Sequence, residues 1–369
     1  YLPAQIAHQA TLIRGVTIYP VHNLKELYLH LKSEHILQAI DNTHLEAKSN
    51  ATHKGGLLDD IHGQTQAKRA MIIAAAGRHN ILLSGSPGAG KTLLASTLTS
   101  LLPELSPDEQ LDVTKLYSLS GESIDTIVRD RPFRTPHHTA SRIAMIGGGS
   151  KPKPGEISLA HLGVLFLDEI PEYPRATLES LRQPLEDKIV SISRAESRVT
   201  YPADFMLVAT MNPCPCGYYG DSTRECVCSS TRILAYQQKL SGPLLDRIDM
   251  IITVPRVETK HLLEHTLSQN TQHTLAQEKI YCATKQQRNR FDSSHKYNAN
   301  VSSKEIKNLI PLSPEVKKLL ETASNKLNLS ARSYFKVIKV ARTIADLDNA
   351  KDITTQHLAE ALQYRPSAS

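Results

Sequence analysis

Long hydrophobic runs are missing from this sequence of 369 residues. No stretch of 18 or more residues is apolar throughout, so the sequence predicts no membrane-spanning helix. Its first residues hold no basic segment followed by an apolar stretch, which excludes a recognisable signal peptide there and leads us to expect a cytoplasmic protein. An excess of one charge is also nearly absent. The 43 lysines and arginines against 37 acidic residues give a net charge of +6, which is compatible with nucleic acid without indicating it.

Cysteines are few as well, but their placement is uneven. Of the five, four lie within fifteen residues, as Cys214, Cys216, Cys226 and Cys228. In a cytosolic protein this clustering favours a metal over disulfides, and four thiolates joined by one loop can form a closed tetrahedral zinc site. The one-residue spacing inside each pair is tighter than in common zinc motifs, so four reduced, partly buried cysteines are the alternative. Cys282 is expected to be a small core residue on a helix.

The length suits two or three domains, and the first 56 residues differ from the rest. A strand-like run over residues 11–19 precedes a helical pattern over residues 24–40. Because the chain starts at Tyr1 rather than Met, inside a segment that reads as rich in strands, we expect it to have lost an upstream piece. Residues 41–56 are polar, have no hydrophobic periodicity and predict a linker.

From Leu57 to about Val254, helical patterns alternate with short apolar strands bounded by glycine and proline, which is typical of a parallel α/β sheet. The predicted strands cover residues 80–84, 164–167 and 205–209. From Thr259 onward the apolar spacing is helical. A polar stretch over residues 285–303 interrupts it and predicts a surface loop.

A glycine-rich segment follows the first of these strands and precedes a helix expected over residues 93–101. This context fits the phosphate-binding P-loop, whose backbone N–H groups surround phosphates while the helix N-terminus adds its positive end. We expect Lys91 to neutralise the β- and γ-phosphates of ATP and the Thr92 hydroxyl to ligate Mg²⁺. A glycine-rich turn that matches by chance is the alternative. The predicted nucleotide contacts are Gly85, Ser86, Pro87, Gly88, Ala89, Gly90, Lys91, Thr92 and Leu93.

Polar side chains end the other two predicted strands. Asp168 and Glu169 follow the apolar strand over residues 164–167, at the edge where ligands bind in open α/β sheets. Asp168 is expected to hold Mg²⁺ and Glu169 to orient and polarise the attacking water, although a solvated acidic pair is the alternative. Asn212 follows the next strand, where a polar side chain can touch the γ-phosphate or the water. Asparagine at a strand end is otherwise usually a turn former.

Two arginines farther along are candidates for contacts with the triphosphate. Arg247 lies at the end of a predicted helix just before a return strand, where it cannot easily reach a phosphate in its own site. It can instead project into the site of a neighbouring subunit and stabilise charge on the transferring phosphoryl group. The alternative is a salt bridge within the chain to Asp246 or Asp249. Arg332, at the start of a long helix, is a candidate phosphate sensor.

In this order the motifs resemble those of AAA+ ATPases, and more narrowly those of the magnesium-chelatase-like AAA+ proteins of the YifB/ComM group. The resemblance covers nearly the whole chain. The segments that carry it are residues 63–64, 67–70, 131–134, 136–138, 154–161, 212–217 and 330–334. It implies a nucleotide contact for Gln64, whereas the polar residues around 291–300 match less well and receive no role.

The resemblance implies an AAA+ fold with a parallel-sheet ATPase core over residues 57–256 and a C-terminal helical lid domain over residues 257–369. The core carries a helix insert (120–162), a β-hairpin (188–201) and a cysteine loop (213–229). Residues 1–40 resemble the end of the Lon-protease-like domain that precedes the ATPase in this group. The family further implies a homo-oligomer, a hexameric ring that uses ATP and Mg²⁺ to move DNA. Its members act as helicases that drive branch migration of recombination intermediates during natural transformation.

Basic residues of the two insertions are the candidates for contact with single-stranded and branched DNA. Residues 188–201 alternate in polarity on both sides of a short turn and predict the β-hairpin; in the resembling families such hairpins point into the channel of the ring. Basic side chains there can follow phosphates without reading the sequence. Solvation, or pairing with acidic neighbours, is the alternative. The candidates are Arg131, Arg134, Lys151, Lys153, Lys188, Arg194 and Arg198.

Two other functions stay open from the sequence. One is a motor subunit of magnesium chelatase, whose ATPase drives metal insertion into a porphyrin. The other is a regulatory module that binds ATP and a protein partner without moving DNA. The Lon-like segment and the cysteine pairs speak against the first, and ATP hydrolysis measured with and without DNA separates all three.

Overall fold

The computed structural model describes residues 1–10, 15–40, 56–121, 127–149, 152–193, 198–221, 223–256, 271–293 and 295–365. Its centre is a five-stranded sheet with the order β11-β3-β10-β7-β4, in which every neighbouring pair is parallel. The parallel α/β sheet predicted from the sequence is therefore confirmed. The strands are β3 (Ile81–Ser84), β4 (Phe133–Arg134), β7 (Val164–Leu167), β10 (Met206–Met211) and β11 (Met250–Thr253).

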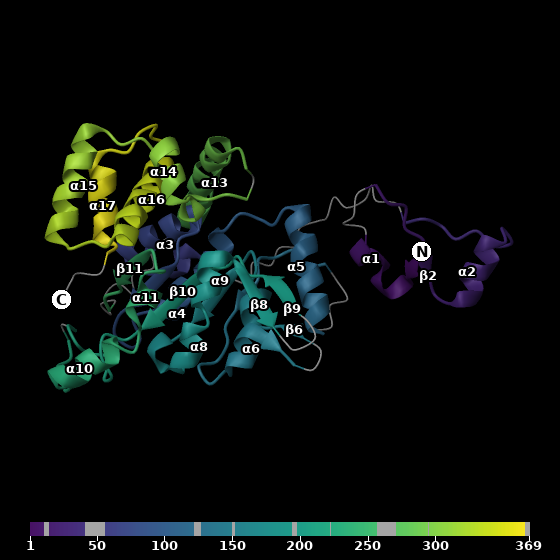
Figure 1. The fold of residues 1–369 in the computed structure, drawn as a ribbon, viewed down its shortest axis with the longest axis horizontal. Helices are drawn as coiled ribbons and strands as arrows, with labels where there is room; N and C mark the ends of the chain where they lie inside the picture. The colour runs from purple at the N-terminus through teal and green to yellow at the C-terminus, as the bar shows by residue number, and fades with distance from the viewer. Residues whose placement is uncertain are drawn as a thin grey trace.

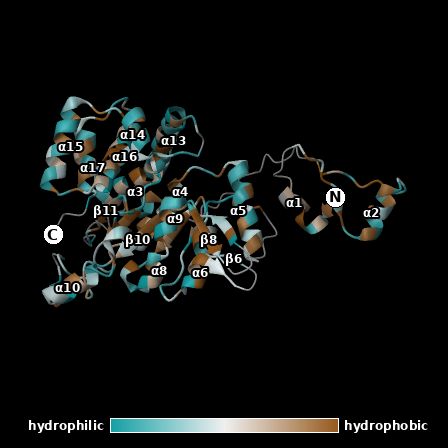
Figure 2. Ribbon diagram, in the orientation of Figure 1, coloured by the Kyte–Doolittle hydropathy of each residue, from teal (hydrophilic) through white to brown (hydrophobic). Residues whose placement is uncertain are grey.

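Alternate residues of these strands pack on opposite faces of the sheet, because successive side chains of a strand point to opposite sides. Ile81 and Leu83 join a large apolar core on one face, while Leu82 joins a second core on the other. Since both faces are covered, the strands are largely apolar, with polar residues such as Ser84 and Thr210 toward their carboxyl ends. In Figure 2 brown, hydrophobic residues gather in the interior around α4, while outer helices such as α15 carry teal residues.

The larger core joins the sheet to the C-terminal helices. It includes α3 (Thr65–Gly77) and α4 (Lys91–Leu101), and it continues without interruption into α13 (Gln272–Phe291) and α16 (Ala331–Leu347). In Figure 1 the C-terminal helices lie together above the sheet, with α3 beneath them. The remaining helices of this group are α14 (Ser303–Leu309), α15 (Pro314–Lys326) and α17 (Thr355–Gln363).

The prediction of a surface loop over residues 285–303 is wrong for much of that range. Helix α13 continues to Phe291, and the side chains of Gln287 and Asn298 are fully buried. The Gln287 amide donates to Ala76 O over 2.9 Å and accepts from Asn298 N over 2.8 Å. These polar residues are therefore buried because each amide is hydrogen-bonded, which a polarity pattern alone cannot show.

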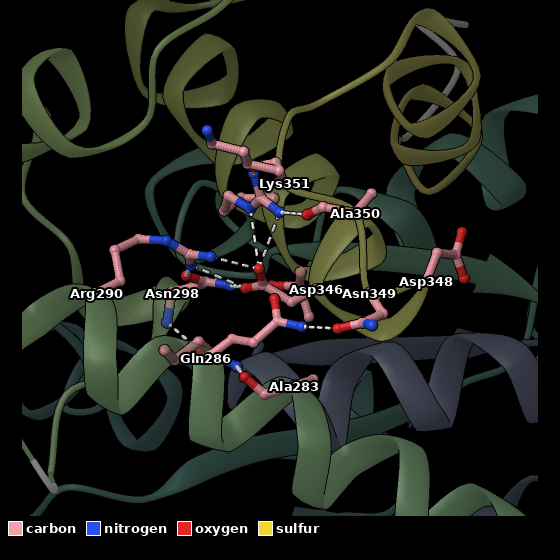
Figure 3. A network of polar contacts seen from close by, with 12 residues as sticks. Ala283, Gln286, Arg290, Asn298, Asp346, Asp348, Asn349, Ala350 and Lys351 are labelled. Atoms are coloured by element: carbon pink, nitrogen blue, oxygen red, sulfur yellow. Dashed lines mark hydrogen bonds and ion pairs between the residues drawn. The ribbon is translucent and has the colours of Figure 1, made fainter.

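A buried ion-pair network continues from Asn298. Figure 3 shows Arg290 and Asn298 pointing toward Asp346. The Asp346 carboxylate accepts from Arg290 over 2.5 and 2.9 Å, from Asn298 Nδ2 over 2.9 Å and from Arg342 Nε over 3.0 Å. The network joins α13 to α16 and so fixes the arrangement of these C-terminal helices.

Two β-hairpins extend from the core. The antiparallel pair β8 (Ile189–Ser193) and β9 (Arg198–Pro202) confirms the hairpin predicted near residues 188–201, and its expected tip lies outside the described residues. The second pair is β5 (Gly147–Gly148) with β6 (Lys153–Pro154). The Tyr201 hydroxyl donates to Pro152 O over 2.7 Å, so the two hairpins lie side by side.

The described part of residues 57–256 contains seven further helices, of which α5 is the longest. They are α5 (Pro107–Ser120), α6 (Arg142–Ile146), α7 (Glu156–Leu159), α8 (Arg175–Glu179), α9 (Arg182–Asp187), α10 (Ser230–Gln237) and α11 (Gly242–Leu245). The 3₁₀ turns are η1 (Ala4–Ile6), η3 (Leu58–Asp60), η4 (Ile170–Glu172) and η5 (Asn298–Asn300). Among the described residues, no helix combines the length and apolar composition needed to cross a membrane.

The first 40 residues contain β1 (Leu2–Pro3), α1 (Ala7–Ala10), β2 (Pro20–Val21) and α2 (Leu24–Leu31), with β1 and β2 parallel. The helix expected over residues 24–40 ends early because Ser33 has a φ of +61°, and Glu34 N then bonds back to Leu29 O. Of the strand expected over residues 11–19, positions 11–14 lie outside the described residues, and the strand itself begins at Pro20. The expected linker is described only at residue 56.

Candidate active site

The predicted P-loop lies between β3 and α4, at the carboxyl edge of the sheet. Gly88 and Gly90 have φ angles of +77° and +80°, which residues other than glycine rarely adopt. A Cβ on Gly85 would lie 2.3 Å from Val254 O, so the start of the loop also requires glycine. The backbone therefore needs glycine at both glycine positions of the P-loop motif, Gly85 and Gly90, and also at Gly88.

Lys91 lies inside this loop and is 9% exposed. Its ammonium donates to Gly85 O over 2.5 Å, to Ser86 O over 3.0 Å and to Asn212 Oδ1 over 3.1 Å. Burial lowers the pKa of Lys91, while the Asp168 and Glu169 carboxylates oppose that effect. The structure thus brings Asn212, the residue after β10, to the P-loop lysine.

Asp168 lies between two threonines, one on helix α4 and the other on strand β10. Thr92 Oγ1, on α4, is 3.5 Å from Asp168 Oδ2, and Thr210 Oγ1, on β10, donates to Asp168 Oδ1 over 2.5 Å. Thr210 also accepts from Glu169 N over 2.9 Å. Sequence reasoning gave Thr210 no role. The register of β10 on β7 places Thr210 beside the end of the strand that precedes Asp168, so its role could be inferred only once the strand pairing is known.

Glu169 has a left-handed backbone with φ of +50°, and its side chain is exposed. Non-glycine residues adopt this conformation at a cost of about 1–3 kcal/mol, and such residues cluster at functional sites. The Thr210 bond to Glu169 N helps to hold the conformation.

Gln64, for which the resemblance implies a nucleotide contact, lies beside the P-loop. Its Nε2 donates to Ala89 O, in the P-loop, over 2.6 Å. Within the described part of the chain, Gln64 Oε1 is buried and accepts no hydrogen bond from the protein. A buried acceptor of this kind requires a donor from outside the described part of the chain.

Arg247 lies at the opposite edge of the sheet. Its carbonyl accepts from Asn80 Nδ2 over 3.0 Å, and Asn80 precedes β3, whereas the P-loop follows that strand. A strand of four residues spans about 13 Å, so the Arg247 side chain is remote from its own P-loop. This matches the expectation that it cannot easily reach its own phosphate.

The intrachain partner of Arg247 is neither of the two considered from the sequence. Its guanidinium bonds Glu186, Arg182 O and Pro243 O, while Asp249 pairs with Lys336. Glu186 also accepts from Arg332 Nη2 over 3.3 Å. Both predicted phosphate-contacting arginines therefore share one exposed carboxylate, and no local sequence pattern marks Glu186.

The candidate DNA-contacting residues differ in exposure. Arg131 is 8% exposed, bonds the backbone carbonyls of Pro103, Glu104 and Leu162, and pairs with Glu109, so we assign it a structural role. The remaining described candidates are less enclosed. Arg134 pairs with Glu156 and Lys188 with Asp204, Lys153 and Arg198 are exposed, and Lys151 and Arg194 lie outside the described residues.

The rings of the adjacent residues His137 and His138 lie tilted against one another, with centroids 4.1 Å apart and an interplanar angle of 35°. His138 packs edge-on against Tyr173, whose hydroxyl donates to Pro136 O over 2.5 Å. Burial, together with the Asp168 carboxylate, raises the pKa of Tyr173 to about 12. Tyr173 therefore lies close enough to Asp168 to feel its charge.

The four clustered cysteines converge, with all four sulfurs within 4.8 Å of one another. The sulfur of Cys216 lies 3.3 Å from that of Cys214 and 3.6 Å from that of Cys226, and the Cys214 and Cys226 sulfurs are 3.7 Å apart. These distances are too long for disulfides, which need about 2.05 Å. Sulfurs at tetrahedral positions 2.3 Å from one zinc ion would lie about 3.8 Å apart. The thiols are free, and the Tyr218 N–H helps to lower the pKa of Cys216 to about 6. Cys282, expected in the core, is exposed on α13 because it lies on the solvent face of the helix.

This fold and this site define a class, the P-loop proteins of the AAA+ type. Residues 57–262 match the family described as magnesium chelatase, subunit ChlI, and residues 270–365 match the C-terminal part of that subunit. The chain belongs to this family. The predicted AAA+ α/β fold with a C-terminal helical domain is thereby confirmed.

Comparison with individual relatives places the chain more narrowly within this family. It is 43% identical to YifB of Escherichia coli K12 over 96% of this chain and 68% of YifB. It is also 43% identical to the competence protein ComM of Haemophilus influenzae, over 98% of this chain and 70% of ComM. The magnesium-chelatase 67 kDa subunit of Chlorobaculum parvum is 25% identical over 42% of this chain and 23% of that protein. The predicted resemblance to the YifB/ComM group is confirmed.

Proposed function

We propose that this chain binds ATP with Mg²⁺ and hydrolyses it as a subunit of a hexameric ring that moves single-stranded and branched DNA. The observation that carries the proposal is the meeting of Lys91, Asn212, Thr92 and Asp168 at one edge of the sheet. These residues come from three separate segments, and their types are those that phosphoryl transfer requires.

Each residue has a distinct task in this proposal. Lys91 neutralises charge on the β- and γ-phosphates, while the Thr92 hydroxyl and the Asp168 carboxylate are the ligands for Mg²⁺. The exposed Glu169 carboxylate polarises the attacking water, and Asn212 orients that water or the γ-phosphate. Thr210 fixes Asp168 and the Glu169 backbone, so it positions both carboxylates.

The ring is supported by the position of the two arginines. Arg247 is held at the far edge of the sheet, with Arg332 on the same carboxylate. From there both can face the nucleotide of a neighbouring subunit and stabilise negative charge on its transferring phosphoryl group. In the assembled ring, Arg247 and Arg332 then bind the phosphates of the neighbouring subunit instead of Glu186.

The DNA surface that we propose consists of the two neighbouring hairpins, β5–β6 and β8–β9. Lys153 and Arg198 are exposed on them, one on each, and Tyr201 ties the hairpins together. Arg134 and Lys188 pair with carboxylates and contribute less free charge. Contacts of this kind bind phosphates without sequence preference and weaken steeply with salt.

The cellular role that we propose is branch migration of recombination intermediates in natural transformation. It rests on the likeness to ComM, which is named a competence protein. The test is ATP hydrolysis measured without DNA, with single-stranded DNA and with branched DNA. Stimulation by DNA that disappears at high salt supports the motor, whereas equal rates with and without DNA reject it.

A magnesium-chelatase motor subunit is the second candidate, because the matching family carries that description. It predicts ATP hydrolysis that ignores DNA and responds to the other chelatase subunits and a porphyrin. The short match to the 67 kDa chelatase subunit supports it less than the long match to ComM supports the first.

We also propose that the four cysteines hold one zinc ion. Their sulfur spacings lie close to those of a tetrahedral thiolate site, and zinc would be bound there as a structural metal with no open position. Element analysis of the purified protein is the test, with one zinc per chain expected.

A further inference from the structure

The cysteine loop, residues 213–229, lies directly on the P-loop. Ser86 Oγ donates to Asp221 Oδ2 over 2.5 Å. A Cβ on Gly217 would lie 2.6 Å from Pro87 Cδ, so the two loops approach as closely as a glycine permits. Consecutive P-loop residues, Ser86 and Pro87, therefore each contact the cysteine loop.

Asp221 is itself held in place by the cysteine loop. Its Oδ1 accepts from Thr223 N over 2.8 Å and from Arg224 N over 3.2 Å, which leaves Oδ2 for Ser86. The hydrogen bonds from Ser86 and Thr223 keep the pKa of the Asp221 carboxyl below its ordinary value. A charged carboxylate thus anchors the Ser86 hydroxyl.

The described residues of the loop form no apolar core, and the loop is held by its sulfurs together with local hydrogen bonds such as that from Arg224 Nη1 to the Tyr218 hydroxyl over 2.9 Å. Its described residues form neither helix nor strand, and among them only Cys214 and Gly217 are buried. Val227, its large aliphatic residue, is 86% exposed. Cys214 Sγ accepts from Tyr219 N over 3.3 Å, so the sulfur cluster also fixes the backbone between the two cysteine pairs.

We propose that metal occupancy of the four cysteines sets the affinity of the P-loop for nucleotide, with Asp221 and Gly217 as the mechanical link. The inference rests on the proposed binding of MgATP to the P-loop. Metal binding supplies folding free energy to a loop without an apolar core. Once the metal leaves, the loop loses its shape and Ser86 and Pro87 lose their supports. Asn212, two residues before Cys214, also loses its position on Lys91.

The experiment measures the affinity of the intact chain for a fluorescent ATP analogue in excess Mg²⁺. Zinc is removed with a chelator selective for zinc over magnesium and is then added back, with zinc content determined at each step. Asp221→Ala breaks the link and leaves all four cysteines. Glu225→Ala removes an exposed carboxylate from the same loop and is the matched control.

Removal of zinc is expected to weaken nucleotide binding about tenfold, as expected for loss of one hydrogen bond to a charged group, and added zinc should restore it. Asp221→Ala should bind more weakly than the wild type while retaining its zinc, but by no more than zinc removal, because Gly217 and Asn212 keep their places. Glu225→Ala should bind normally. Affinity unchanged by zinc removal, unchanged affinity in Asp221→Ala, or purified protein without zinc overturns the proposal. If Asp221→Ala does not fold, the reversible removal of zinc decides.

Failure of the underlying function gives a different result. In that case the zinc-loaded chain binds no nucleotide, and Lys91→Ala is indistinguishable from it. A chain that binds nucleotide equally well with and without zinc contradicts only the metal link.

Discussion

The Thr210 hydroxyl donates a hydrogen bond of 2.5 Å to the Asp168 carboxylate, and it accepts another from Glu169 N. One fully buried side chain on β10 therefore holds both acidic residues at the end of β7. Groups that orient a metal ligand matter almost as much as the ligand itself.

Thr210→Val keeps the shape of the side chain and removes the hydroxyl. We expect ATP turnover to fall about 10–100-fold, with a raised requirement for Mg²⁺, because Asp168 loses the bond that orients it. Steady-state hydrolysis over a range of Mg²⁺ concentrations measures this. Thr210→Ser, which keeps the hydroxyl, should stay near the wild-type rate, and equal losses in both variants contradict the positioning role.

Arg247→Ala tests whether this arginine acts on a neighbouring subunit. Because Arg247 lies at the sheet edge opposite the P-loop, a single chain should bind ATP with unchanged affinity. Hydrolysis by the assembled protein should nearly disappear, since such arginines contribute about 10³–10⁵-fold to turnover. Binding and turnover are measured side by side. A loss of ATP affinity in the isolated chain contradicts the assignment.

Asp346→Ala leaves the buried Arg342 and the partly buried Arg290 without their shared carboxylate. We expect a loss of about 3–5 kcal/mol of unfolding free energy, the usual cost of breaking a buried ion pair. Denaturant unfolding followed by circular dichroism measures it. Asp348, labelled in the same view, is about half exposed and pairs with Arg69. Asp348→Ala should cost under about 1 kcal/mol, and a similar loss in both variants argues against the network.

His161 makes stability depend on pH. Burial lowers its pKa to about 4, with the nearby Asp204 carboxylate offsetting part of the effect, and its Nδ1 accepts from Asp204 N over 3.0 Å. As pH falls below 6.5, the unfolded chain takes up the proton first. Stability from this residue is therefore complete above pH 6.5 and falls by up to about 3 kcal/mol as pH approaches 4.

His161→Asn keeps an acceptor near the Nδ1 position and does not titrate. Between pH 7 and 4 it should lose less unfolding free energy than the wild type in denaturant titrations. Parallel losses in the two proteins would show that His161 is not the group responsible.

Local sequence patterns predicted those parts of the site that come directly after a single apolar strand. The P-loop, the acidic pair after Val164–Leu167 and Asn212 each lie at the end of an apolar strand, and the carboxyl ends of parallel strands share one edge. Thr210 was missed because its role depends on the register between β10 and β7, which one sequence does not display.

Other residues depend on contacts between distant segments. Glu186 meets Arg247 and Arg332 from positions 61 and 146 residues away, and no nearby spacing indicates such a partner. Arg131 reads as a free basic residue, but its guanidinium bonds backbone carbonyls that only the fold brings to it. Gln287 and Asn298 likewise read as surface residues, since polarity indicates exposure unless the hydrogen-bond partners are known.

Hydrolysis of bound ATP by Glu169→Gln, compared with binding by Lys91→Ala, tests the central claim most directly. If Glu169 polarises the water while Lys91 grips the phosphates, Glu169→Gln binds ATP like the wild type. In a single turnover it then hydrolyses ATP at least about a hundredfold more slowly. Lys91→Ala loses the binding itself. Wild-type single-turnover rates in Glu169→Gln, or normal ATP affinity in Lys91→Ala, would contradict the account.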